Sequence, residues 1–155
     1  MKRLLAIGLF TCSLFAQGVY TAEYKATGLS SAASVVTVQL GNITTIKAVY
    51  LQSAAVYCSV ACEITLERDG TQATGTALTP TATRSGSPTV KATAWRSSDA
   101  GVGTVLARYL IPAGGTLLLE LEDIVLVPQR ILENFTVRTA AISGNAIIVV
   151  KWKEI

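Results

Sequence analysis

The sequence contains no histidine, and only 15% of its 155 residues are charged. Histidine is the side chain that proteins use most often as a general base and as a metal ligand. Its absence argues against nucleophilic catalysis of the serine or cysteine type, and it leaves too few ligands for a zinc site. We therefore expect a protein that is not an enzyme and has no cofactor.

The chain also lacks a large excess of positive or of negative charge. The chain has 13 Lys and Arg against 10 Asp and Glu, with no basic run. A nucleic-acid-binding domain usually concentrates basic residues on one face, so we expect no nucleic-acid partner. Because half of the residues are hydrophobic, disorder is not expected either, and the length fits one domain.

The longest apolar run, residues 4–16, is too short for a transmembrane helix, which needs roughly 18–20 residues. Lys2 and Arg3 precede the run, and small residues follow it, which is typical of a secretory signal peptide. We predict a signal peptide over residues 1–16, cleaved after Ala16 or Gly18. This implies no membrane span and a secreted location, extracellular or at the cell surface. A buried N-terminal element and a lipid anchor at Cys12 are the alternatives.

Cleavage would leave residues 17–34 as an N-terminal segment and residues 35–155 as a β-sandwich domain. It would also leave two of the three cysteines, Cys58 and Cys62. An even number of cysteines in an exported chain favours a disulfide. Residues four apart in a straight strand lie about 13 Å from each other, whereas a disulfide needs Cα atoms within about 7 Å. The pairing therefore requires a turn over residues 59–61, and two free buried thiols are the alternative.

Apolar residues recur with a period of two along most of the remaining chain. The clearest segments are 36–40, 46–52, 63–67, 90–95, 105–109, 117–122, 135–139 and 147–152. Turn signals such as Asp69-Gly70 separate them, and no amphipathic helix pattern occurs between them. This arrangement predicts an all-β fold, an antiparallel β-sandwich of eight to nine strands. A jelly-roll-like topology is the leading expectation, and an immunoglobulin-like one is the alternative.

Two of these segments, 117–119 and 147–150, are apolar at consecutive positions. The strands of a small sandwich usually present one face to solvent. A strand that is apolar on both faces indicates a second buried contact. We expect this contact to be another copy of the chain in a homo-oligomer, and cover by loops of the same chain is the alternative.

Two clusters are candidate ligand sites. Trp95 precedes Arg96 and Asp99 in a polar stretch, where the indole could stack on a sugar ring of a surface glycan; alternatively, Trp95 closes the edge of the sandwich. Glu120, Glu122 and Asp123 supply the oxygen ligands that Ca²⁺ prefers. A solvated strand face is the alternative for these acids, and no other metal site is expected.

Three segments carry a resemblance to known proteins: residues 63–70, 110–117 and 134–139, with Trp152 close to the end. Through these segments, residues 35–155 resemble small phage and bacterial jelly-roll-like β-sandwich structural proteins. The resemblance implies a protein that decorates virions, forms fibre heads or builds extracellular assemblies, often as a trimer. Virion proteins assemble in the cytosol, so the predicted leader favours a bacterial surface or matrix role. We therefore expect a secreted structural subunit that self-associates, with a carbohydrate-binding module or a virion-associated protein as alternatives.

Overall fold

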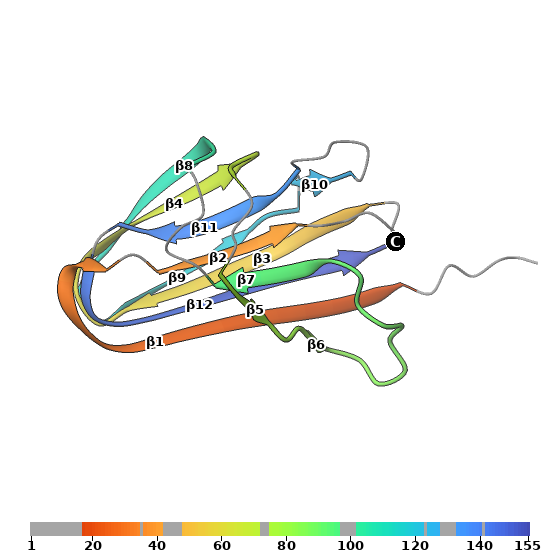
Figure 1. The fold of residues 1–155 in the computed structure, drawn as a ribbon, viewed down its shortest axis with the longest axis horizontal. Helices are drawn as coiled ribbons and strands as arrows, with labels where there is room; N and C mark the ends of the chain where they lie inside the picture. Colours follow the sequence, from red (N-terminus) through yellow and green to blue (C-terminus); the bar gives the residue numbers. More distant parts are fainter. Residues whose placement is uncertain are drawn as a thin grey trace, which may run out of the picture.

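The computed structural model describes residues 17–34, 36–41, 48–71, 75–96, 102–122, 124–127, 133–140 and 142–155. The predicted signal peptide, residues 1–16, lies outside this range, as do Asp99 and Asp123. All regular structure in the described residues is β-strand, arranged in two six-stranded antiparallel sheets that form two layers (Figure 1). Over the same residues, no helix has the length and apolar character needed to cross a membrane.

The first sheet, sheet A, has the order β10-β3-β12-β1-β6, with β9 pairing to the same side of β3 as β10. Its strands are β1 (Gly18–Ser34), β3 (Val49–Cys58), β6 (Thr81–Ala82), β9 (Gly115–Glu120), β10 (Val125–Leu126) and β12 (Ile142–Glu154). Sheet B has the order β5-β7-β2-β11-β4-β8. Its strands are β2 (Thr37–Gly41), β4 (Cys62–Arg68), β5 (Thr76–Leu78), β7 (Thr93–Arg96), β8 (Thr104–Ile111) and β11 (Phe135–Thr139).

The long strands pair in a nested order, from the two ends of the chain toward its middle. β1 pairs with β12 and β2 with β11, then β3 pairs with β9 and β4 with β8. Successive pairs lie alternately in sheet A and sheet B. The chain is thus an antiparallel ribbon folded over itself, and its two layers enclose one core.

The core follows from the period-two pattern. In sheet B the inward positions are Val38 and Leu40 of β2 and Ile64 and Leu66 of β4, and all four are at most 3% exposed. They face inward positions of sheet A that are equally buried, among them Ala54, Val56, Ile148, Val150 and Trp152. β-Branched and leucine side chains at alternate positions therefore specify both layers.

The structure differs from the sequence expectation in two respects. The prediction of eight to nine strands is too low, because four of the twelve strands have four residues or fewer: β5, β6, β7 and β10. The stretch 17–34, predicted as a segment outside the sandwich, contains β1, which pairs with β12 and β6 in sheet A. Its inward side chains are Tyr20, Ala22, Tyr24 and Ala26, a weaker apolar signal than the valine and leucine of the other strands.

Candidate functional site

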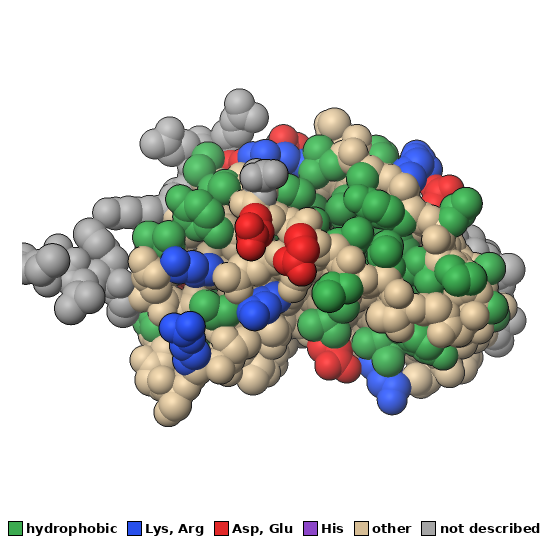
Figure 2. All heavy atoms as spheres, turned by 180° about the vertical axis from the view of Figure 1, so that it is seen from behind, with side chains coloured by type: hydrophobic (Ala, Val, Ile, Leu, Met, Phe, Trp, Pro, Cys, Tyr) green, Lys and Arg blue, Asp and Glu red, His purple; other side chains and the backbone are tan. Residues whose placement is uncertain are grey.

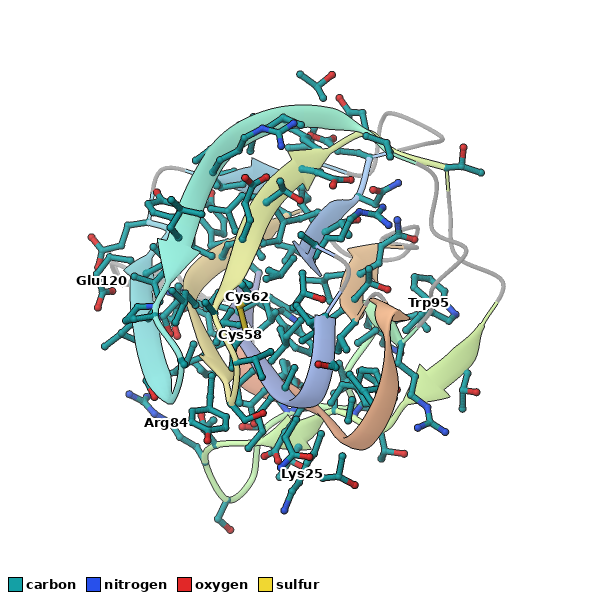
Figure 3. All side chains as sticks on the ribbon, turned by 90° about the vertical axis from the view of Figure 1, so that its left-hand side faces the viewer. Lys25, Cys58, Cys62, Arg84, Trp95 and Glu120 are labelled. Carbon is teal, nitrogen blue, oxygen red and sulfur yellow. A yellow bond between two sulfur atoms is a disulfide. The ribbon has the colours of Figure 1, made fainter. Side chains whose placement is uncertain are left out.

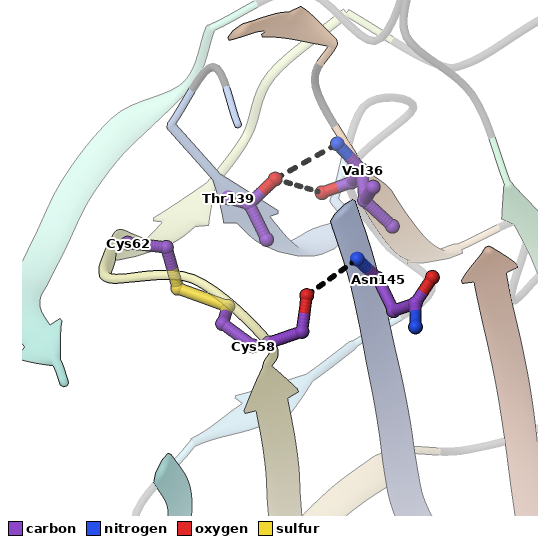
Figure 4. The surroundings of a disulfide bond; sticks show 6 residues. Val36, Cys58, Cys62, Thr139 and Asn145 are labelled. Carbon is purple, nitrogen blue, oxygen red and sulfur yellow. Dashed lines mark hydrogen bonds between the residues drawn. A yellow bond between two sulfur atoms is a disulfide. The ribbon is translucent and has the colours of Figure 1, made fainter. Parts of the chain in front are cut away.

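A disulfide joins Cys58, the last residue of β3, to Cys62, the first residue of β4. The two Cα atoms are 6.5 Å apart across the bend at residues 59–61, as the spacing requires. Cys58 is fully buried. The Ser59 hydroxyl beside it accepts a hydrogen bond from the backbone N–H of Asn145 in β12, at 2.7 Å (Figure 4). Because β3 and β4 belong to different sheets, the disulfide fixes the corner where the chain crosses between the layers.

Replacing both cysteines with alanine should lower the free energy of unfolding by about 2 kcal/mol, the loop-entropy value for so short a closed loop. The fold should survive, because the rest of the core is unchanged. Urea denaturation of the double variant and of reduced wild-type protein measures the loss. Failure of the double variant to fold would show that the corner depends on the disulfide far more than loop entropy allows.

Trp95, the candidate for stacking on a sugar ring, is largely buried. It lies in β7 between Gln39 of β2 and Ala77 of β5, and it is only 9% exposed. The exposed Arg96 guanidinium lies over the ring of Tyr24 in β1, 5.1 Å from its centroid. Asp99 is outside the described residues. The geometry therefore fits the interpretation in which Trp95 covers an edge region of sheet B.

The acidic cluster proposed for calcium is only partly described. Glu120 ends β9 on its outward face, and Glu122 follows in a turn, with the buried Leu121 between them. Glu120 and Trp95 lie on opposite sides of the molecule (Figure 3). Asp123 is outside the described residues, and nowhere among the residues that are described do three His, Cys, Asp or Glu side chains gather as a metal would require.

Sequence reasoning missed three buried carboxylates: Glu67, Glu133 and Glu154, each 4% exposed or less. Glu133 accepts hydrogen bonds from Arg68 and from the Val127 amide. Glu67, on the outer face of β4, accepts two hydrogen bonds from the Arg138 guanidinium, at 2.7 and 3.1 Å. For Glu67, the signal was an acid within a strand of alternating apolar residues, but only the strand register shows which cation it meets.

The pKa of Glu67 reflects two opposing effects. Burial raises the pKa, but hydrogen bonds from Arg138, the Gly103 amide and Thr65, together with the Arg138 charge, lower it below its ordinary value. Glu67, Thr65 and Arg138 line a cavity of about 210 Å³, and the two acids in its wall are paired with neighbouring arginines. Glu67 therefore stays ionised at neutral pH and acts as a structural partner of Arg138.

Glu154 holds a long loop against the end of the sandwich. Its carboxylate accepts hydrogen bonds from the Lys91 and Ala92 amides, both at 2.9 Å, and from the Trp152 indole at 3.1 Å. The Tyr20 hydroxyl donates to the Pro88 carbonyl of the same loop. Burial, and then the charge of Glu154, raise the pKa of Tyr20, so its phenol remains a donor at neutral pH.

Replacing Glu154 with glutamine should lower the free energy of unfolding by about 1–3 kcal/mol, because an amide cannot accept from all three donors and leaves one buried and unsatisfied. Glu122→Gln is the matched control, since that side chain is exposed in a turn. We expect the control to change stability by less than about 0.5 kcal/mol. Equal losses in the two variants, measured by urea denaturation, would contradict the assigned role of Glu154.

Several exposed apolar side chains lie on β8, the edge strand of sheet B, and on β9, which pairs at the edge of sheet A. Leu110 is 82% exposed and Leu118 is 64% exposed. Leu110 also lines an open apolar depression of about 460 Å³ beside Cys62 and Pro112. We call the exposed apolar residues of β8 and β9 the β8–β9 flank: Val105, Leu106, Leu110 and Leu118.

The outer face of sheet A is also partly apolar. The strand register places its outward side chains in rows across β9, β3, β12 and β1. The rows are Thr116–Tyr57–Ile147–Lys25, Leu118–Ala55–Val149–Glu23 and Glu120–Ser53–Lys151–Thr21. Figure 2 shows the molecule from behind, with a broad hydrophobic region next to a smaller group of basic and acidic side chains.

No protein-family model matches the chain, and neither the search of curated proteins nor that of solved structures finds a match.

Proposed function

We propose that the protein is a secreted, non-enzymatic structural subunit, a jelly-roll β-sandwich that self-associates in a surface or extracellular assembly. The observation that carries the proposal is the β8–β9 flank, where Leu110 and Leu118 are 82% and 64% exposed. Apolar side chains that are exposed to this degree favour an interaction site. The open edges of the two strands also offer unpaired backbone groups to a neighbour. Both features lie on the same side of this sandwich.

The strand order supports a jelly roll. A double-sheet jelly roll contains eight strands in two Greek keys. The observed pairing is nested: β1 pairs with β12, β2 with β11, β3 with β9 and β4 with β8. It favours this form, because successive pairs alternate between the sheets. The short strands β5, β6, β7 and β10 are then additions to an eight-strand plan.

Two further features support secretion and a structural role. The Cys58–Cys62 disulfide suits an oxidising compartment, where such bonds persist. The buried carboxylates of Glu67, Glu133 and Glu154 are held by arginines and backbone amides, which is how structural acids are satisfied.

Export of the full chain from a bacterial host tests the secretion part of the proposal. We expect the protein outside the cytoplasm, with an N-terminus at Gln17 or Val19 and no titratable thiol after denaturation without reductant. A chain that remains in the cytoplasm, retains residues 1–16 and shows reactive thiols at Cys58 and Cys62 would contradict it.

A further inference from the structure

The charges on the outer face of sheet A are arranged in a self-complementary way. Glu120 on β9 and Lys151 on β12 lie in the same row, on either side of Ser53 in β3. Their backbones lie about 10 Å apart, across two strands. Neither residue forms an ion pair with any described part of its own chain.

The neighbouring row repeats this geometry with apolar residues. Leu118 on β9 and Val149 on β12 lie on either side of Ala55 in β3. Leu118 is 64% exposed, so the apolar row is open to a partner. β3 therefore lies midway between an acid and a base in one row, and midway between two aliphatic side chains in the next.

We infer that this face binds the same face of a second copy about a two-fold axis that runs along β3. Rotation about such an axis keeps each row at its own level and places β9 of one copy over β12 of the other. Glu120 then faces the partner's Lys151, and Leu118 faces the partner's Val149. Face-to-face sheets pack in this aligned way, within about 30° of each other.

Other two-fold arrangements of the same face match it less well. An axis along β12 would place Lys25 over Tyr57 and Glu23 over Ala55. An axis across the strands, between the two rows, would place Glu120 over Leu118 and Lys151 over Val149. Each of these buries a charge against an apolar side chain, which is unfavourable. Of these three axes, only the one along β3 joins opposite charges and joins apolar residues.

This inference rests on the proposed self-association and names its partner and contact surface. The test is the dissociation constant from sedimentation velocity of the exported protein, for wild type, Glu120→Lys, Lys151→Glu and the double variant. Each single change should weaken association by about tenfold or more, because like charges then face each other twice per dimer. The double variant restores opposite charges and should recover wild-type association to within about threefold.

Glu23→Lys is the matched control. Glu23 lies on the same face but on β1, which the two-fold axis along β3 leaves without a partner strand. We expect it to change the dissociation constant by less than about threefold, as for a charge outside the contact. Thermal unfolding of every variant confirms that the sheet is intact.

The outcomes separate the inference from the proposed function. If wild type associates and the single charge changes leave its dissociation constant unaltered, or the double variant fails to recover, this interface is overturned while self-association stands, with the β8–β9 flank as the contact to test next. If wild type remains a single subunit at every concentration, the proposed self-association itself fails.

Discussion

Trp152→Ala should lower the free energy of unfolding by about 3–5 kcal/mol, the range for deleting a buried tryptophan. Trp152 is fully buried in β12, and its ring centroid lies 6.0 Å from that of Tyr20 in β1. The substitution leaves a large cavity beside Tyr20, and it removes one of the three hydrogen bonds that Glu154 accepts. The loss is a large fraction of the 5–15 kcal/mol that typically stabilises a domain.

Urea denaturation measures this loss, and two variants separate its causes. Trp152→Phe removes the indole N–H but keeps an aromatic ring, so it should cost less than the alanine change. Lys153→Ala, the next residue on the outward face of β12, should change stability by less than about 0.5 kcal/mol. A loss below about 1 kcal/mol for Trp152→Ala would contradict the assignment of this side chain to the core.

Glu67→Gln should also cost about 3–5 kcal/mol at neutral pH, because it removes one partner of a buried ion pair. The side chains of Glu67 and Arg138 are 3% and 13% exposed. The chain offers a matched pair on the same face of β4, since Glu63 binds Arg108 at 2.6 Å, with exposures of 36% and 60%. Glu63→Gln should therefore cost less than about 1 kcal/mol, as exposed ion pairs do.

The effect of Glu67→Gln should depend on pH. The pKa of Glu67 in the folded protein lies below its ordinary value of 4.5, so the ionised carboxylate stabilises the fold at higher pH. That contribution is complete above the unfolded pKa and is lost as the pH falls through the folded pKa. The difference in unfolding free energy between wild type and Glu67→Gln should therefore shrink below pH 4.5. A difference that stays constant or grows on acidification would contradict this account.

Much of the fold follows from alternation in the sequence, because valine, isoleucine and leucine at every second position mark strands such as β4 and β11. β1 escaped prediction because its inward side chains are alanine and tyrosine. The sequence did not predict the buried polar groups on the outer face of sheet B, for a different reason. Gln39 and Glu67 occupy outward positions, yet Gln39 donates to the Thr71 carbonyl and Glu67 accepts from the Gly103 amide. Loops distant in sequence bury them, and no local pattern records that.

Among the candidate sites, too, the sequence predicts the features that depend on nearby residues but not those that depend on distant strands. The cysteine spacing was sufficient to predict a bend at residues 59–61, because bond geometry leaves no other way to join the pair. Trp95 had a polar sequence context that suggested a ligand, but its exposure depends on strands β2 and β5, which lie far away in the chain. The complementary rows on sheet A depend on the pairing of β3 with both β9 and β12, which the sequence alone does not reveal.

The central claim, that this chain is a subunit made to associate with itself, is tested most directly by sedimentation equilibrium of the exported wild-type protein. We expect a molar mass of at least twice that of one chain, decreasing toward the single-chain value on dilution. A mass that equals one chain across the whole concentration range would contradict the claim.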